Sequence, residues 1–234
     1  MIDTAAGRHL TPSPDLTHGR HPERAVGDMR AVHEILDSEA VCHVAFTLDG
    51  WPYAIPTVHA RDGDRLLIHG STLSRMLGGL AAGIPACVTV TVIDGIVCAR
   101  SAFHHSLNYR SAMVFGTATP VRGHDEKLAA MRAIVEHVLP GRWSEVRHPK
   151  PTELRATEIV ALPLNQATAK VRTGGPIESP ADLKKRVWSG VLPLHTHVDA
   201  PVLVPDDVAE LALPASVAAV LAASSRQDGS AGQR

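Results

Sequence analysis

Aromatic residues are scarce in this 234-residue sequence: phenylalanine, tyrosine and tryptophan together make up 3%, eight residues in all. With so few rings, a surface on which nucleic-acid bases stack one after another is not expected. The charges are also balanced. The sequence has 23 basic and 24 acidic residues, and its formal net charge is −1. Neither property favours a nucleic-acid partner.

Long hydrophobic runs are also missing. No apolar stretch approaches the roughly 20 residues of a membrane-spanning helix, and residues 1–4 carry an early acid instead of the apolar core of a secretory signal. The three cysteines, Cys42, Cys87 and Cys98, show no CxxC spacing. We therefore expect a cytoplasmic protein with reduced thiols and no membrane partner.

Several catalytic motifs are absent. The sequence has no Walker, GxGxxG or GxSxG pattern and no cysteine in an activating frame, so we assign no catalytic residue. Histidine, in contrast, is abundant with 14 residues, which raises a metal or haem hypothesis. His195 and His197 can share one face of the chain, but the sequence fixes no cysteine or carboxylate beside them, so no metal site is predicted.

What the sequence does contain is a series of short β-rich runs and a few amphipathic helices. Strands are predicted over residues 40–48, 53–60, 65–69, 86–93, 96–103, 109–121, 158–164 and 167–173. Helices are predicted over residues 28–36, 73–80 and 125–139. Asp-Gly pairs at 49–50, 62–63 and 94–95 predict hairpin turns. Neighbouring hairpins with inserted helices favour an antiparallel barrel or α+β domain.

The ends of the chain lack this periodicity. Residues 1–23 are rich in proline, glycine, histidine and threonine, and are predicted to be a flexible arm. Residues 195–234 form a C-terminal extension that becomes rich in alanine and serine, and its last ten or so residues are expected to be disordered.

The most informative segment runs from His69 to Arg75, with the sequence HGSTLSR. A strand ends, glycine allows a tight turn, and hydroxyl residues then open a helix that carries an arginine in its first turn. Free N–H groups, hydroxyls and a guanidinium together suit a phosphate group. An ordinary helix cap followed by a solvated arginine fits the same spacing, so the residues alone leave both interpretations open.

Two further features also allow two interpretations. The polar run from His104 to Ser111 fits either a set of groups aimed into a cleft or a solvated hairpin loop, and neighbouring His104 and His105 point to opposite faces of a strand. Trp188 follows a charged segment, and fits either a core anchor or the edge of a ligand pocket.

Taken in order, these segments resemble the FMN-binding split-barrel family typified by pyridoxamine 5′-phosphate oxidase, and within it the flavin-nucleotide-binding branch that is similar to nitroimidazole-resistance reductases. The resemblance covers residues 24–194. The matching motifs are DGWP at 49–52, IP at 55–56, IHGS at 68–71, SR at 74–75, TVT at 89–91, DG at 94–95, ARSAFHHS at 99–106, NYRS at 108–111, FG at 115–116, AKVR at 169–172 and VWSGVLPL at 187–194.

The resemblance implies a mainly β, α+β fold: an antiparallel six-stranded split β-barrel with flanking helices, two copies of which form a homodimer with FMN at the interface. It gives phosphate roles to Ser71, Ser74 and Arg75, beside His69. The family's second base is replaced here by Met76, so the resemblance implies a phosphate grip that is either weaker or completed by Arg110. The remaining residues implied at the cofactor are Pro56, Thr57 and Val58 along the isoalloxazine ring, Arg110 and Ser111 at the start of a later strand, and Lys170 and Trp188 at the ring end.

The substrate is not implied. Pyridoxamine oxidation in the family depends on a C-terminal basic and aromatic motif that is missing after Trp188. The leading prediction is an FMN-dependent oxidoreductase that passes electrons from a nicotinamide donor to a small organic acceptor. Three alternatives stay open: a non-catalytic flavin-binding or sensing protein, a haem-binding or haem-degrading protein, and a protein that binds the deazaflavin F420.

Overall fold

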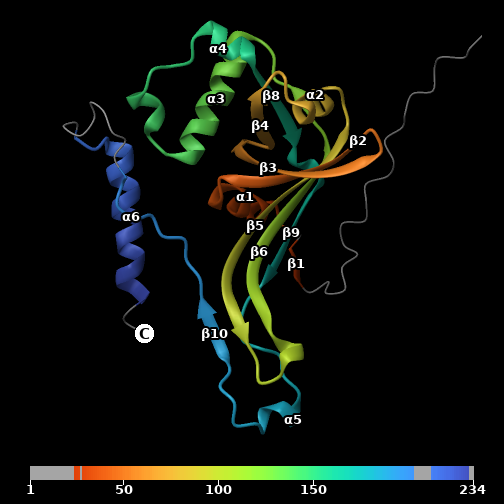
Figure 1. The fold of residues 1–234 in the computed structure, drawn as a ribbon, viewed down its shortest axis with the longest axis vertical. Coiled ribbons are helices and arrows are strands. Elements are labelled where there is room, and N and C mark those ends of the chain that lie inside the picture. Colours follow the sequence, from red (N-terminus) through yellow and green to blue (C-terminus); the bar gives the residue numbers. More distant parts are fainter. Residues whose placement is uncertain (1–23, 27, 203–211, 232–234) are drawn as a thin grey trace, which may run out of the picture.

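The computed structural model describes residues 24–26, 28–202 and 212–231, so the arm predicted at residues 1–23 lies outside the described residues. Figure 1 shows a curled sheet with helices around one end and a long strand pair extending away from it. The strands are β1 (Ala25–Val26), β2 (Val41–Leu48), β3 (Trp51–Asp62), β4 (Arg65–Ser71), β5 (Pro85–Cys98), β6 (Ser106–Thr117), β7 (Thr119–Pro120), β8 (Thr157–Pro163), β9 (Ala167–Arg172) and β10 (Gly190–Pro193). The helices are α1 (Met29–Ser38), α2 (Arg75–Ala81), α3 (His124–Val138), α4 (Pro151–Ala156), α5 (Pro180–Leu183) and α6 (Ala215–Ala231).

All strand pairs in the described part of the chain are antiparallel, in the order β1-β9-β6-β5-β2-β3-β4-β8-β7, with β10 added to β5. β3 belongs to both halves of the sheet, because it pairs along most of its length with β2 and by its last four residues with β4. The sheet curls until β6 contacts β8. This confirms the split-barrel, α+β prediction, although the sheet has ten strands among the described residues instead of six.

Alternating residues of these strands fill the barrel. The buried cluster includes Val44, Leu66, Ile68, Val88, Val114 and Val160. Helix α2 closes one end by burying Leu77 and Leu80 in the same cluster, and α1 adds Ile35 and Leu36. A second, smaller cluster lies outside the barrel, where Ala130 and Ile134 of α3 cover Leu67 and Ile159 of the sheet.

One predicted turn is wrong. Asp49-Gly50 and Gly63 adopt positive φ angles and make the expected hairpins, but the chain does not turn at Asp94-Gly95. β5 continues through this pair with a register shift between Ile93 and Gly95, as a β-bulge gives. The physical reason is tertiary, because β10 pairs with β5 here and a Cβ on Gly95 would lie 3.0 Å from the backbone oxygen of Leu192. The predicted strand over residues 96–103 therefore belongs partly to β5, and the chain reverses beyond Cys98.

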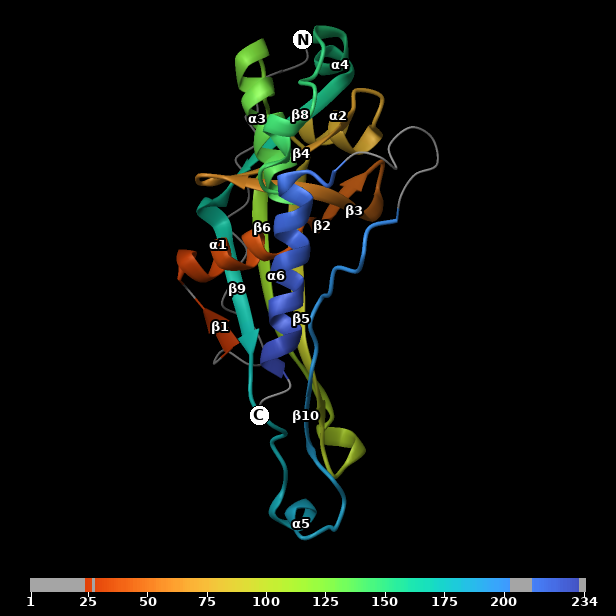
Figure 2. The same cartoon turned by 90° about the vertical axis from the view of Figure 1, so that its left-hand side faces the viewer.

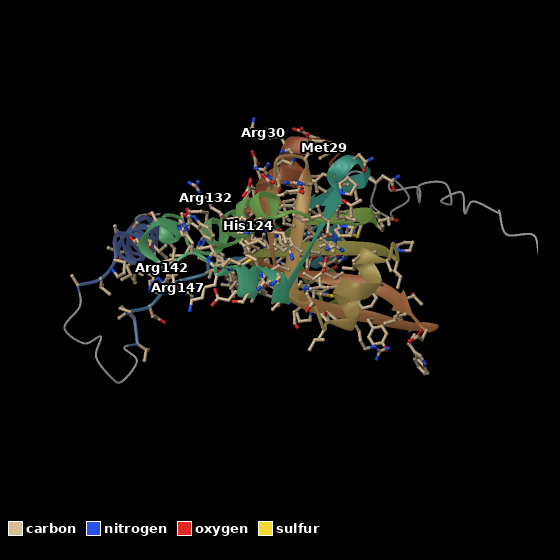
Figure 3. The ribbon with its side chains drawn as sticks, turned by 90° about the horizontal axis from the view of Figure 1, so that it is seen from above. Met29, Arg30, His124, Arg132, Arg142 and Arg147 are labelled. Atoms are coloured by element: carbon tan, nitrogen blue, oxygen red, sulfur yellow. The ribbon has the colours of Figure 1, made fainter. Side chains whose placement is uncertain are left out.

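The C-terminal extension contains a long helix. α6 extends from Ala215 to Ala231, so most of the end expected to be disordered is helical in the described part of the chain. Glu145 accepts hydrogen bonds from the Ser216 amide, at 3.0 Å, and from its hydroxyl. Figure 3 shows Arg142 and Arg147 beside the end of α6, and Arg142 pairs with Glu145 at 3.3 Å. None of the described helices is long and apolar enough to cross a membrane.

Candidate functional site

The strand register places several predicted site residues on one face of the sheet. Ser111 of β6 lies opposite Lys170 of β9 on one side and opposite Thr91 of β5 on the other. Residues directly opposite one another in an antiparallel pair project to the same face. Lys170 and Ser111 therefore share a face, opposite to the one that carries the buried Ala112.

The same face continues across β2 and β3. Pro56 lies opposite His43, and His43 lies opposite Thr89, which in turn pairs with Met113, two residues from Ser111. Because side chains alternate along a strand, Pro56 and Val58 project to the side of Ser111 and Lys170.

On β4 the face ends at His69 and Ser71. The last paired residues of β3 and β4 are His59 and Ile68. Val58 and His69 are the next residues along these two strands, so they project to the same face. We call this surface the outer face. It carries six of the predicted residues: Pro56, Val58, His69, Ser71, Ser111 and Lys170.

His69 is a polar residue of the outer face whose ring is partly buried. Its Nδ1 atom is buried without a hydrogen-bond partner. Burial lowers the pKa of the imidazole below its ordinary value, because a charged ring is poorly solvated there. At neutral pH the ring is therefore uncharged, and it can donate or accept a hydrogen bond.

The corner where β4 leads into α2 places the predicted phosphate residues side by side. Ser71 Oγ accepts the amide hydrogen of Leu73 at 3.1 Å, and Ser74 is the N-cap of α2, its Oγ accepting from Leu77 N at 3.4 Å. Each hydroxyl keeps its own hydrogen for a ligand. Arg75 reaches Asp49 at 3.2 Å, but both side chains are at least 70% exposed, so this ion pair is weak.

Glycine allows close packing at this corner. A Cβ on Gly70 would lie 2.9 Å from Cδ1 of Leu77, which is buried in the barrel. The hydroxyl groups and the cation of the corner therefore lie next to the point where β4 and α2 pack against each other.

Two predicted residues project away from the outer face. Thr57 alternates with Pro56 and lies opposite the buried Cys42. Arg110 alternates with Ser111, and its Nε and Nη2 bind the Asp94 carboxylate at 2.9 to 3.2 Å. This hydrogen-bonded carboxylate raises the pKa of Arg110. The structure thus separates Arg110 from both Ser111 and the phosphate corner.

Trp188 lies far from the other predicted residues within one chain. It follows α5 and precedes β10, at the end of the molecule opposite to β4 and α2 (Figure 1). The side chain is 65% exposed, and Cζ2 approaches within 3.0 Å of the position that a Cβ on Gly190 would take. Trp188 is therefore not a core anchor.

Three residues to which the sequence analysis gave no site role complete the outer face. His43, Thr89 and Met113 occupy the row between Pro56 and β9, and alternation along residues 86–93 is the signal that identifies Thr89. Next to this row, a surface hollow of about 520 Å³ is lined largely by apolar groups, among them Cys87 and Phe115. Among the described residues, no three His, Cys, Asp or Glu side chains gather as a metal site.

The sequence model of the pyridoxamine 5′-phosphate oxidase family matches residues 28–171. This range is more than half of the chain and contains the barrel, the outer face and the β4–α2 corner. The chain belongs to the pyridoxamine 5′-phosphate oxidase family. No curated protein matches it in sequence.

Two solved structures of similar proteins share most of its length. An FAD and haem binding protein of Mycobacterium smegmatis is 38% identical, with a TM-score of 0.81, over 84% of this chain and 97% of its own. The flavocytochrome Anf3 of Azotobacter vinelandii is 32% identical, with a TM-score of 0.83, over 89% of this chain and 97% of its own. A Bacteroides thetaiotaomicron protein assigned to 5-nitroimidazole antibiotic resistance, 22% identical with a TM-score of 0.53 over 63% of this chain and 86% of its own, shares the fold alone.

Proposed function

We propose that this member of the pyridoxamine 5′-phosphate oxidase family binds a flavin nucleotide on the outer face, with its phosphate at the β4–α2 corner. The observation that supports this most directly is the common face of six predicted residues, which ends at the hydroxyls and the cation of that corner. The residues present fit the group. An apolar ring needs a flat, mostly uncharged surface, and a phosphate needs donors and positive charge.

At the corner, Ser71 and Ser74 would each donate a hydroxyl hydrogen to the phosphate while still accepting from the amides of Leu73 and Leu77, respectively. Arg75 would exchange its exposed pairing with Asp49 for a charge-assisted bond to the anion. Because both hydroxyls are already held by backbone amides, little further conformational entropy is lost when the anion binds.

On the face itself, Pro56 and Val58 would supply apolar contact, and Ser111 and Lys170 would hold the polar edge of the ring system. His69 would hold or pass a proton, since its buried imidazole is neutral at neutral pH. A bound flavin would supply the hydride and electron chemistry. We propose that the protein positions a nicotinamide donor and then a small organic acceptor against this face.

The candidate flavins differ in the number of phosphates that the protein has to bind. The single corner suits the one phosphate of FMN, whereas the M. smegmatis relative is an FAD and haem binding protein. Mass analysis of the chromophore released from the purified protein separates FMN, FAD and F420. A colourless protein that takes up none of these when they are added would contradict the proposal.

Catalysis is tested separately. Anaerobic mixing of the flavin-loaded protein with NADH or NADPH should bleach the flavin absorbance within the time of a turnover. If a flavin is bound but neither donor reduces it, the protein is a binding or sensing module instead of an oxidoreductase.

A homodimer is part of this proposal. The outer face carries exposed uncharged side chains in one chain, such as Val41 at 48% exposure. Exposed apolar side chains on a sheet face suit an interface with a second copy. Trp188 is too far along the molecule to close a site at its own β4–α2 corner, so its predicted role at the ring would be at the other chain's site in the dimer.

Haem binding is a second candidate function. It is favoured by the two relatives above 30% identity, one an FAD and haem binding protein and the other a flavocytochrome. A Soret band in the purified protein, or one that develops on titration with haemin, is the expected result. Its absence in both experiments would remove this function.

A further inference from the structure

The far end of the long strand pair forms a three-stranded extension of the sheet. We call it the distal sheet, and it consists of residues 93–98 of β5, residues 106–109 of β6, and β10. In Figure 2 these strands extend away from the rest of the sheet towards α5. The two faces of the distal sheet differ in how far the rest of the chain covers them.

One face of the distal sheet is buried. Val97 and Asn108 project to this face and are 0% and 8% exposed. Just beyond β5, Arg100 pairs with Glu178 of the loop before α5, and the Glu178 side chain is almost wholly buried. The loop before α5 is therefore held against this end of the sheet.

The opposite face of the distal sheet continues the outer face and is bare. Leu107 lies four residues before Ser111 on β6, so both project to the same face. Ile96 of β5 lies opposite Leu107, and Leu192 of β10 lies opposite Ile96. These three residues, which we call the apolar row, are 42%, 38% and 48% exposed in the order just given.

The outer face of β5 and β6 carries no charge. These two strands, which lie inside the described part of the chain, contain one charged residue each, Asp94 and Arg110. The two pair with each other at 2.9 Å, and Arg110 projects away from the outer face. A face of uncharged side chains over the whole length of two long strands suits burial against another protein surface.

The other end of the same face is concave. The apolar hollow of about 520 Å³ described above includes Ala45, Cys87 and Phe115 in its lining. These residues lie opposite one another on β2, β5 and β6, and Cys87 alternates with the neighbours of Thr89 so that it projects to the outer face. Ile96 lies nine residues beyond Cys87 on β5, a distance of about 30 Å along an extended strand.

A second copy of this chain fits both features at once. In a twofold dimer both chains use the same surface, and every contact occurs twice. A twofold axis perpendicular to the sheet near Thr91, about midway between Cys87 and Ile96, makes the two β5 strands antiparallel and brings the apolar row of each chain over the hollow of the other. An unrelated partner would need a ridge and a hollow of its own at the same spacing.

We propose that the apolar row of one chain packs into the apolar hollow of a second copy, and that the second copy's row fills the hollow of the first. The inference rests on the proposed homodimer and adds its register. It also explains the bulge between Ile93 and Gly95, because this shift of the alternation turns Ile96 to the same face as Ile93. The rows in between, where Ser111 and Lys170 lie, would be enclosed by both chains, as the proposed flavin site needs.

The first test places a carboxylate in the apolar row. Ile96→Glu and Leu107→Glu should each raise the dissociation constant of the dimer more than about a hundredfold, because the carboxylate would be buried against apolar groups. Val138→Glu, at the end of α3, changes an apolar side chain of similar exposure (51%) away from this face and should leave the constant unchanged. Sedimentation equilibrium measures all three, and circular dichroism shows whether each variant is folded.

The second test identifies the residues that meet. In a Cys98→Ser background, Ile96→Cys should form a crosslink between chains with the partner's Cys87 when a short bismaleimide is added. The crosslinked dimer should disappear when Cys87→Ala is also introduced. A crosslink that survives Cys87→Ala would mean that Ile96 of one chain lies beside the same residue of the other.

The outcomes separate this register from the homodimer itself. If wild-type protein is a monomer, the proposed homodimer fails. If wild-type protein is a dimer but the two glutamate variants dimerise equally well, the proposed register is overturned. The same holds if Ile96→Cys gives no crosslink in the dimer or one that does not depend on Cys87.

Discussion

His59 and His69 lie on neighbouring strands, but their surroundings differ. His59 is wholly buried, and its Nε2 donates to the Leu36 carbonyl over 3.0 Å, at the end of α1. The ring of His137 lies 5.1 Å away, and Nδ1 of His59 has no partner. Burial is the main reason that the pKa of His59 falls from 6.5 to about 4.

This pKa predicts how stability depends on pH. Below pH 6.5 the unfolded chain binds a proton at His59 that the folded chain does not, so stability is lost as pH falls from 6.5 to about 4. The loss at this residue amounts to about 3 kcal/mol. His59→Gln keeps a hydrogen-bond donor for the Leu36 carbonyl but does not titrate. Over this pH range the variant should therefore lose less free energy of unfolding than the wild type does. Urea unfolding at several pH values measures this, with the exposed His124→Gln as control; equal pH dependence in wild type and His59→Gln would contradict it.

Arg75 and Asp49 form a matched pair for testing the phosphate corner. Arg75→Ala removes the cation and should weaken flavin binding by about ten- to a hundredfold, the effect of one charge-assisted hydrogen bond. Asp49→Asn keeps the arginine and removes only a weak, exposed pairing, so binding should change by less than about threefold. Flavin fluorescence titration measures both constants, and equal losses in the two variants would argue against a phosphate role for Arg75.

At the scale of elements, α2 combines packing with the candidate site. Its buried side chains anchor the helix in the barrel, while Leu73, just before it, is 90% exposed. The corner residues are therefore anchored to the core through α2, in addition to their own hydrogen bonds.

This packing predicts a contrast between two leucines of the same segment. Leu77→Ala leaves a cavity in the barrel and should reduce the free energy of unfolding by about 2–5 kcal/mol. Leu73→Ala should change it by less than about 0.5 kcal/mol. Chemical unfolding measures both, and a small effect at Leu77 would mean that α2 is not anchored as described.

At the scale of the whole molecule, the open outer face predicts a dimer of twice the 24.9 kDa chain mass in sedimentation experiments. His43→Glu places a charge in the middle of that face and should give monomers that bind flavin poorly. Ala129→Glu, on the exposed side of α3, should leave the dimer intact. A wild-type monomer, or a His43→Glu dimer, would contradict the proposed interface.

The local features of this protein follow from residues that are neighbours in the sequence. Alternation of apolar residues marks most of the strands and the turn chemistry marks two of the three Asp-Gly pairs as hairpins, because both depend on neighbours in the chain. The hydroxyl-rich corner from Ser71 to Arg75 is equally local. The order of the motifs along the chain also indicates the family, and the family model confirms it.

Which residues share a face depends on contacts between distant parts of the chain. The bulge at Asp94-Gly95, the pairing of Arg110 with Asp94 and the distance of Trp188 from the corner all follow from register between strands far apart in the sequence. Such register depends on how the whole sheet closes around its core, and a shift of one residue exchanges the two faces of a strand. For the same reason Leu192, Ile96 and Leu107 form one row that no local pattern could have shown.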